Sequence, residues 1–563
     1  MTDSEYETNT CVEQAIPTPI RSCKDVMHQI GQVLVSEGHV AADRLEELEH
    51  RAQWLDEPLD RIIRREDVVP QIVLLNAAST VTGIPACRLG QLKVDAEAVA
   101  TITSKLAEHY RIMPLSLRDG ALTVATYRIY DVSEEDQLRV VIGRPLRWVL
   151  APSRDISESI KHYYGVGIGA LLGPQGGDES QAGDDGATTP SNIVHFVEEV
   201  LTDAIRSDAT DVHFEPSDNA LRLRYRIDGV LDTIALPRGV EQHRRAIVSS
   251  IKVLAQLDIA EKRLPKDGRF SFEVDDSVYD MRVSVLPTRY GEAINLRVLN
   301  SHSTLRTWGE LGINEAQRDC LEDLTAQPHG MVIFAGPTGS GKTTSLYATL
   351  ARLNDEARKI ITIEDPVEYQ IKGITQLQVH PEIGFNFATG LRSVLRHDPD
   401  VILVGEIRDE ETARIAMGAA LTGHLVLSTL HTNDSVSAIP RLVDMGVEPY
   451  LVATSVAGVV AQRLVRLICK SCKTTIPIDD GIRNRIQSEC GDTELPERFH
   501  EGRGCPDCRF TGYRGRRAIL EILVIDEALR SLAAERVPSA LLLERAIKNG
   551  LIPLRNEGWQ AAI

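Results

Sequence analysis

The chain has 563 residues and a formal net charge of −19, with 43% hydrophobic and 25% charged residues. A chain of this length is too long to fold around a single hydrophobic core, so we predict about three or four domains. The residue balance is typical of a soluble globular protein. The acidic net charge argues against a general nucleic-acid-binding protein, which needs a basic surface to neutralise phosphates.

We find no pattern for export or membrane insertion in the sequence. The first residues, "MTDSEYETNT", are acidic and polar, whereas a secretory signal begins with basic residues. The nearest candidate for a span is "YLVATSVAGVVAQRLVRLIC" (450–469), but Arg463 and Arg466 interrupt it, so it suits a buried helix better. We therefore expect a cytoplasmic protein whose nine cysteines are mostly reduced.

The amino-terminal part predicts a polar tail followed by a helix-rich domain. Residues 1–25 are polar with scattered prolines and are expected to be disordered. In the domain predicted at 26–164, "IGQVLVSEGHVAADRLEEL" (30–48) and "LDRIIRREDVVPQIVLLNA" (59–77) share their apolar spacing, which predicts two similar helical hairpins. Strand-like "GALTVATY" (120–127) and "PLRWVLA" (145–151) follow them.

A composition change marks the next boundary. Residues 165–192 are rich in Gly, Ser, Asp and Pro, which predicts a flexible linker. Residues 193–303 predict a smaller α/β domain that opens with a helix over 194–205 and contains strands at 220–229 and 281–288. From residue 304 to 563 the pattern becomes strand–loop–helix repeats, which are typical of a parallel-sheet α/β domain.

The strongest motif is "MVIFAGPTGSGKTTSLYATL". Met331–Ala335 reads as a strand, and Gly336–Thr343 fits G-x-x-x-x-G-K-[ST] at every fixed position. Backbone N–H groups of such a loop surround phosphate oxygens, Lys342 reaches the β- and γ-phosphates, and the Thr343 hydroxyl ligates Mg²⁺. The predicted nucleotide-binding residues are Gly336, Pro337, Thr338, Gly339, Ser340, Gly341, Lys342, Thr343 and Thr344.

Polar residues end three further strands. In "ITIEDPVEY" (361–369) the apolar run ends at Glu364. In "DPDVILVGEIRD" (398–409) the apolar run is followed by Glu406. In a P-loop fold such carboxylates hold Mg²⁺ or orient the attacking water, and the sequence leaves open which glutamate does which. "LTGHLVLSTLHTND" (421–434) places His431 among polar residues at a strand's carboxyl end, where γ-phosphate is sensed, although a histidine in such a strand is more often a core residue.

These segments occur in an order that resembles the type II secretion and type IV pilus assembly ATPases. The likeness includes "DATDVHFEP", "RYRIDGVL", "KDGRF" and "RVSVLPTRYGE" upstream and "AQRLVR" downstream, over about residues 190–555. It implies an α/β fold with a RecA-like P-loop ATPase domain, preceded by a smaller α/β domain of PAS-like type and a helix-rich accessory domain. It also implies a hexameric ATP-hydrolysing motor that assembles a pseudopilus or a pilus at the cytoplasmic face of the inner membrane.

The resemblance implies roles for particular residues. Arg282 and Arg297 match arginines that cap ATP from the preceding lobe, and Arg392 lies in the ATPase domain; a guanidinium suits this task because its planar donors pair with phosphate. We expect that a ring must form before Arg282 and Arg297 reach ATP. The remaining catalytic candidates are Glu364, Glu406 and His431.

The resemblance also implies partners. They are an inner-membrane platform protein and a membrane-anchoring adaptor, the latter reached through the amino-terminal domain. The repeats there are similar to a cyclic-di-GMP-binding module, but their openings at 29–31 and 58–60 both lack its arginine. We therefore expect protein docking rather than cyclic-di-GMP binding.

Two C-x-x-C pairs, Cys469/Cys472 and Cys505/Cys508, suit a disulfide pair, a redox centre or a metal site. A reducing compartment disfavours the disulfides, and no thioredoxin-like strand and helix flank either pair. Their position resembles the tetracysteine zinc insert (residues 465–515 here) that assembly members of the family carry and retraction members lack. The four cysteines are therefore predicted to bind one zinc ion.

Two other function classes stay open at this point. RecA-like ATPases include nucleic-acid motors, which the net charge of −19 disfavours. A regulatory adaptor that binds ATP without hydrolysing it is the other alternative. The sequence does not choose between a secretion and a pilus client, and we expect the last helix before Ile563 to be short or absent.

Overall fold

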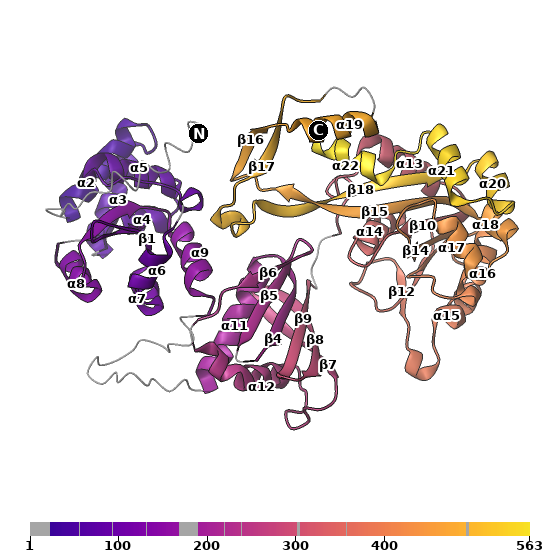
Figure 1. The fold of residues 1–563 in the computed structure, drawn as a ribbon, viewed down its shortest axis with the longest axis horizontal. Coiled ribbons are helices and arrows are strands. Elements are labelled where there is room, and N and C mark those ends of the chain that lie inside the picture. Colours follow the sequence, from indigo (N-terminus) through magenta and orange to yellow (C-terminus); the bar gives the residue numbers. More distant parts are fainter. Residues whose placement is uncertain are drawn as a thin grey trace.

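The computed structural model describes residues 23–55, 57–92, 94–130, 132–167, 190–218, 220–237, 239–300, 305–355, 357–490 and 495–563. Separate hydrophobic cores lie in residues 23–164, 190–300 and 305–563, which we call the N-terminal, middle and C-terminal segments (Figure 1). Among the described helices, none is both long and apolar enough to cross a membrane. The predicted tail up to residue 22 and most of the predicted linker lie outside the described residues.

The N-terminal segment begins with two helix–turn–helix units at the positions of the repeat. They are α2 (Cys23–Ser36) with α3 (Ala42–Leu55), and α4 (Leu59–Arg65) with α5 (Gln71–Thr82). The two units pack on each other, mainly through α2 on α5 and α3 on α4, rather than as closed hairpins. The matched apolar positions of the repeat are all buried: Ile30, Leu34, Val40, Leu45, Leu59, Ile63, Val69 and Leu74. Helix α2 starts at Cys23, so the expected disorder of residues 1–25 does not extend to its end.

A three-stranded sheet completes this segment. Its strands lie in the order β1-β2-β3, with β1 antiparallel and β3 parallel to β2. The remaining elements are η1 (Leu89–Gln91), α6 (Ala96–Thr101), α7 (Ser104–Tyr110), β1 (Ile112–Arg118), β2 (Ala121–Thr126), α8 (Val132–Ile142), β3 (Leu146–Leu150) and α9 (Ser153–Tyr164). Beyond α9 the described chain stays packed, because the Val166 N–H donates to the Ala235 carbonyl of the middle segment at 3.1 Å. Val166, which belongs to the predicted linker, is therefore part of the core of the middle segment.

The middle segment is a six-stranded antiparallel sheet in the order β6-β5-β4-β9-β8-β7. Helices α11 (Pro190–Arg206) and α12 (Arg244–Leu254) pack against it. Alternating exposure along β7 is typical of a sheet with one solvated face. The other elements are β4 (Ala209–Pro216), β5 (Leu221–Ile227), β6 (Val230–Ile234), η2 (Val240–His243), β7 (Lys266–Val274), β8 (Ser277–Thr288) and β9 (Gly291–Asn300).

The C-terminal segment has a seven-stranded sheet in the order β12-β11-β13-β14-β10-β15-β18, in which only β18 runs antiparallel. The strands are β10 (Gly330–Ala335), β11 (Ile360–Glu364), β12 (Thr375–Gln378), β13 (Val401–Val404), β14 (Leu425–Leu430), β15 (Val456–Ile468) and β18 (Tyr513–Val524). Strands β10, β11, β13 and β14 are buried throughout, as strands covered on both faces must be. In such sheets ligands bind at the carboxyl ends of the strands.

Helices flank this sheet (Figure 1). They are α13 (Glu315–Thr325), α14 (Lys342–Leu353), η3 (Pro381–Ile383), α15 (Phe387–Val394), α16 (Glu410–Leu421), α17 (Ala438–Asp444), α18 (Pro449–Ser455), α20 (Glu527–Ala534), α21 (Ser539–Lys548) and α22 (Leu554–Ala562). The final helix, α22, is present and packs on β18. We expected the last helix to be short or absent; it is present, and it is short, with nine residues.

The secondary structure predicted for residues 450–469 was wrong. We expected one buried helix, but α18 ends at Ser455 and the chain continues as the 13-residue strand β15. Strand β15 lies between β10 and β18, so residues Val456–Gln462 are buried on both faces and carry no polar alternation. An apolar run of this kind has the same pattern in a buried strand and a buried helix, and its valines favour the strand.

The cysteine insert lies at the far end of β15 and β18. Strands β16 (Lys473–Pro477) and β17 (Arg498–Gly502) form an antiparallel ribbon, with α19 (Asp480–Cys490) between them and η4 (Pro506–Cys508) after them. Figure 1 shows β15 and β18 extending beyond the rest of their sheet toward the N-terminal segment.

Candidate functional site

The Gly336–Gly341 loop connects β10 to the amino end of α14. Gly336 has φ +152° and Gly341 has φ +86°, a region that favours glycine. A Cβ on Gly336 would lie 2.5 Å from the Ser340 Oγ, and one on Gly341 would lie 2.8 Å from the Gln462 Nε2. The loop is therefore a tight backbone cradle against β15, and it leads into a helix amino terminus that attracts anions.

Lys342 is buried inside this cradle. Its Nζ donates to the carbonyls of Gly336 at 2.7 Å and Pro337 at 3.1 Å. Burial lowers the pKa of Lys342; the nearby Glu406 raises it and Arg463 lowers it further. A phosphate beside the ammonium would favour its charged form, so the position suits an anionic ligand.

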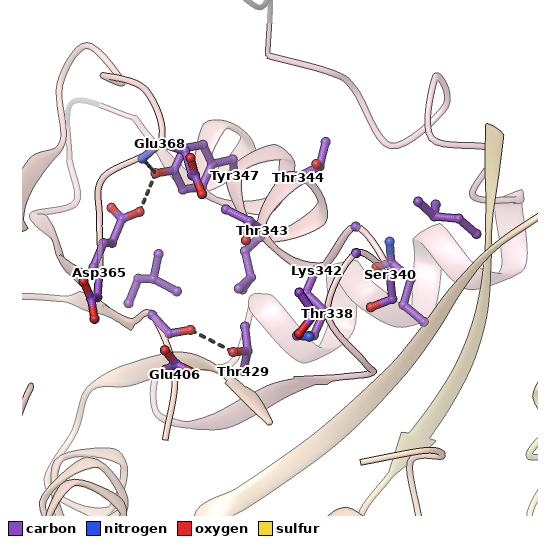
Figure 2. A pocket seen from close by; sticks show the side chains of 18 of the residues that line it. Thr338, Ser340, Lys342, Thr343, Thr344, Tyr347, Asp365, Glu368, Glu406 and Thr429 are labelled. Carbon is purple, nitrogen blue, oxygen red and sulfur yellow. Dashed lines mark hydrogen bonds between the residues drawn. The ribbon is translucent and has the colours of Figure 1, made fainter. Parts of the chain in front are cut away.

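A cavity of about 760 Å³ opens over the cradle. Thr338, Gly339, Ser340, Gly341, Lys342, Thr343 and Thr344 all line it. Figure 2 shows this loop on one side of the cavity, with Glu406 and Thr429 below it and Asp365 and Glu368 opposite. The cavity therefore brings together the P-loop and the ends of β11, β13 and β14, which the sequence had predicted to meet.

Glu364 lies at the end of β11 and is buried at the cavity wall. Its Oε2 accepts a hydrogen bond from the Tyr347 hydroxyl of α14. Its Oε1 accepts from Thr362 Oγ1 at 2.6 Å and from Gln376 Nε2 at 3.2 Å. Burial, together with this bond to Glu364, raises the pKa of Tyr347. Both carboxylate oxygens of Glu364 are thus fixed by neighbouring side chains.

Glu406 follows β13 and is more accessible than Glu364. Its Oε2 lies 3.4 Å from the His431 Nε2, and its Oε1 pairs with Arg408. The hydrogen bond with Glu406 raises the pKa of Arg408. Glu406, Arg408 and His431 all line the cavity, so this carboxylate faces the space that a nucleotide would occupy.

The three predicted arginines lie in different surroundings. Arg297 lines the cavity of its own chain and pairs with Asp211 at 3.3 Å. Arg282 pairs with Glu368, a cavity residue, at 3.9 Å. Arg392 does not line the cavity, because it points to the surface pair with Glu411 at 2.7 Å. Arg297 thus lines the cavity within one chain. That a ring brings Arg282 and Arg297 to ATP stays a prediction.

Several cavity residues were not predicted from the sequence. They are Arg306, Tyr347, Tyr369, Arg408, Gln462 and Arg516. Arg408 stands two residues after Glu406 in "GEIRD", and this spacing was the one available signal. Arg516 comes from β18, more than a hundred residues beyond the P-loop, so local patterns carry no sign of it.

The loop after β14 is held by a buried carboxylate. Glu521 of β18 accepts hydrogen bonds from the Ser435 N–H at 2.8 Å and from the Leu554 N–H at 2.9 Å. On the same loop, the Asn433 carbonyl accepts from Arg463 Nη2 at 2.8 Å. Through these hydrogen bonds Glu521 links the loop that follows His431 to the start of α22.

We expect Glu521→Gln to destabilise this loop by about 1–3 kcal/mol, because a charged acceptor of buried hydrogen bonds is lost. Hydrogen exchange of residues 432–437 should be faster in the variant. Glu535→Gln, which changes an exposed carboxylate on the same segment, is the matched control. Unchanged exchange in Glu521→Gln would show that the loop does not depend on this carboxylate.

The four cysteines of the insert meet in a second cluster. Cys469, Cys472, Cys505 and Cys508 are buried, and their sulfurs all lie within 4.8 Å of one another. The Sγ–Sγ distances are 3.8 Å for Cys469–Cys505, 3.8 Å for Cys472–Cys508 and 3.7 Å for Cys505–Cys508. These distances are too long for disulfide bonds.

The spacing fits a tetrahedral metal ion. Four sulfurs about 2.3 Å from a central zinc would lie about 3.8 Å from one another. The N–H groups of Cys505 and Gly512 point at the Cys508 Sγ, at 3.1 and 3.2 Å. Such N–H···S contacts are the outer-shell support that thiolate ligands receive in metal sites. The donor set is therefore suited to zinc.

Comparison with protein families agrees with this geometry. The model described as "Type II/IV secretion system protein" matches residues 187–563, more than half of the chain. The "MshEN domain" model matches residues 82–170. The resemblance noted from the motifs is thereby confirmed.

Curated relatives are similar over most of their length. The type II secretion system protein E of Pectobacterium carotovorum subsp. carotovorum is 45% identical over 458 residues, which cover 81% of this chain and 87% of that protein. The type IV pilus assembly ATPase PilB of Myxococcus xanthus (strain DK1622) is 36% identical over 545 residues, 94% of this chain and 95% of that protein. Among solved structures, the Legionella pneumophila ATPase DotB is 22% identical with a TM-score of 0.47, over 65% of this chain and 92% of that chain.

Proposed function

The chain belongs to the family of type II/IV secretion system proteins, and from that premise we propose that it is a hexameric motor that hydrolyses ATP to assemble a pseudopilus or a pilus. The motor would act at the cytoplasmic face of the inner membrane. The observation that carries the proposal is the single cavity that joins Lys342 and Thr343 to two acidic strand ends. The family supplies ATP and Mg²⁺ as the ligands of that cavity.

The cradle residues bind the phosphates in this proposal. Backbone N–H groups of the Gly336–Gly341 loop and the start of α14 surround the β- and γ-phosphates, and Lys342 exchanges its carbonyl partners for phosphate oxygens. The Thr343 hydroxyl, exposed at the cavity floor, and Glu364 are the groups that would hold Mg²⁺. Arg297 and Arg282 neutralise charge that develops on the phosphates.

We assign the orientation of the attacking water to Glu406. Both oxygens of Glu364 already accept bonds from Tyr347, Thr362 and Gln376, so its carboxylate is the less available acceptor for a water molecule. The Glu406 side chain is 15% exposed at the cavity. Its two oxygens contact Arg408 and His431, whose side chains are themselves exposed, so a water molecule can reach this carboxylate. A carboxylate so placed accepts the water's hydrogen bond and later its proton.

Three further assignments complete the proposal. We place one zinc ion between the four cysteines, where it folds the insert and takes no part in hydrolysis. Arg392 remains a candidate contact to a neighbouring subunit, since it lies on the surface with Glu411. The N-terminal segment docks on a membrane-anchoring adaptor and the ring acts on an inner-membrane platform protein, with cyclic-di-GMP as the alternative ligand of that segment. For the domain limits we propose those predicted from the sequence, with the tail ending before Cys23 and the N-terminal boundary of the linker moved past Val166.

ATP turnover by the purified full chain tests this proposal. We expect Mg²⁺-dependent hydrolysis, and we expect Lys342→Ala to weaken ATP binding about 10- to 150-fold, as the loss of a charge-assisted hydrogen bond implies. Lys372→Ala, which removes an exposed lysine of the same segment that does not line the cavity, is the matched control. ATP binding without turnover, even with the membrane partners present, would favour the adaptor alternative.

A gene deletion in the source organism tests whether the motor assembles a secretion pseudopilus or a pilus. Deleting the gene should abolish either secretion through a type II system or surface piliation, and the wild-type chain should restore it. A strain that keeps both activities would contradict the motor assignment. Turnover that requires DNA and falls steeply with salt would support the nucleic-acid alternative.

A further inference from the structure

The loop that carries the second cysteine pair contacts both other segments of the chain. Arg509 and Phe510 follow Cys508 directly, and Pro506 and Asp507 lie between Cys505 and Cys508. We call residues 504–511 the knuckle. Its partners lie hundreds of residues earlier in the sequence, in η1 and α9 of the N-terminal segment and in α11 of the middle segment.

Arg509 carries the contact with the middle segment. Its Nη1 lies 3.0 Å from the Asp203 Oδ2 and 2.7 Å from the Ser207 Oγ, and its guanidinium sits over the Tyr225 ring at 5.6 Å. The Asp203 side chain is only 6% exposed, and its other oxygen accepts from Lys161 of α9 at 2.9 Å. One buried carboxylate thus joins all three segments.

The N-terminal segment fits closely against the same loop. A Cβ built on Gly90 would lie 2.5 Å from the Pro506 Cδ and 2.7 Å from the Cys505 Cα, so the backbones touch where only glycine fits. The rings of His162 and Phe510 are in contact, with their centroids 4.6 Å apart and their planes tilted by 42°. At the edge, Arg154 pairs with Asp507 at 3.2 Å.

The cysteines determine the shape that makes these contacts. Arg509 has φ +52° and Phe510 has φ +64°, a left-handed conformation that is unfavourable for side chains of this size. The turn is closed by hydrogen bonds from the Phe510 N–H to the Cys505 carbonyl at 2.9 Å and from the Thr511 N–H to the Cys508 carbonyl at 3.1 Å. A metal ion that joins Cys505 and Cys508 to the other pair would hold this turn together.

We propose that the metal-bound knuckle is an internal docking surface that holds the N-terminal and middle segments on the ATPase domain. Its fit is steric at Gly90 and ionic at Asp203. Loss of the metal would unfold the turn, withdraw Arg509 and release helix α9. The metal site would then set how firmly the adaptor-binding segment is coupled to the motor, a role beyond folding the insert. The expected effect of metal removal rests on the proposed zinc site. The docking contacts of Gly90 and Arg509 do not depend on it.

Hydrogen exchange of the full zinc-loaded chain tests the docking from both sides. In Gly90→Ala the added methyl group meets Cys505 and Pro506, and in Arg509→Ala the carboxylate of Asp203 loses a buried partner. Each variant should speed exchange in α9 (Ser153–Tyr164) by about tenfold or more, the order that loss of a charge-assisted bond implies, while keeping its zinc. Chelation of the wild-type zinc should have the same effect on α9.

Two matched controls separate docking from general damage. Gly309→Ala adds a methyl group where no atom lies within 4 Å, and Arg514→Ala removes an exposed arginine near the same loop. Both should exchange like the wild type. The inference is overturned if Gly90→Ala and Arg509→Ala leave α9 unchanged, or if chelation loosens the insert and not α9. Because no readout uses ATP hydrolysis, these outcomes are independent of the proposed catalytic function.

Discussion

Glu406→Gln is expected to lower the rate of ATP hydrolysis by a factor of about 10² to 10⁴, the usual contribution of a positioned general base. The amide keeps the size of the side chain and the neighbourhood of His431, but it cannot accept a proton from the attacking water. ATP binding should persist, since the carboxylate does not belong to the phosphate cradle. Steady-state turnover and nucleotide affinity, measured on the assembled protein, separate the two effects.

Comparison with Glu364→Gln decides between the two acidic strand ends. We expect this variant to lose packing order around Tyr347, because an amide cannot accept from Tyr347, Thr362 and Gln376 at once. Its turnover should fall less than that of Glu406→Gln. Glu411→Gln, which removes an exposed carboxylate beside Arg392, is the control for charge alone. If Glu364→Gln stops turnover and Glu406→Gln does not, the two roles must be exchanged.

Cys469→Ser is expected to reduce bound zinc from about one ion per chain to nearly none and to unfold the insert. Structural zinc contributes about 10–16 kcal/mol of apparent binding free energy in small zinc domains, so its loss exceeds what the rest of the insert offers. Besides the cysteine cluster, the described residues of the insert form a two-stranded ribbon, helix α19, the short η4 and the paired ends of β15 and β18. Elemental analysis and hydrogen exchange over residues 469–512 give the two readouts.

Cys490→Ser is the matched control for this experiment. Cys490 ends helix α19 of the same insert but is not one of the four clustered sulfurs. Its variant should retain zinc and the exchange pattern of the wild type. A Cys469→Ser protein that remains protected over the insert, or a wild-type protein that folds without metal, would show that the cysteines hold the insert without an ion.

The parts of the molecule that local chemistry determines were predictable. The Gly336–Thr343 loop needs its residues at fixed offsets, and the apolar repeat of the two helix–turn–helix units has a helical period, so both appear directly in the sequence. The four cysteines were predictable for the same reason, since each pair forms one tight turn. The stretch at 450–469 was not, because a strand buried on both faces loses the alternation that distinguishes it from a helix.

Contacts between residues far apart in the sequence also could not be predicted. The bond from Tyr347 to Glu364, which limits what that glutamate can do, depends on how α14 packs on β11. Arg509 and Asp203 are 306 residues apart, and each alone reads as an ordinary surface charge. Such pairs arise from the packing of whole elements, for which periodicity and spacing carry no information.

Strand β15 has a mechanical consequence. Its residue Gln462 lies against the cradle at Gly341. The same strand, with one irregularity in its pairing between Arg466 and Ile468, leads to Cys469, seven residues on. At about 3.3 Å per residue this distance is about 23 Å, and pairing with β18 stiffens it along its length. A tilt of about 10° at the nucleotide end would therefore displace the cysteine cluster by about 4 Å. Strand β15 would thus link the proposed phosphate site to the cysteine cluster against which the N-terminal and middle segments pack.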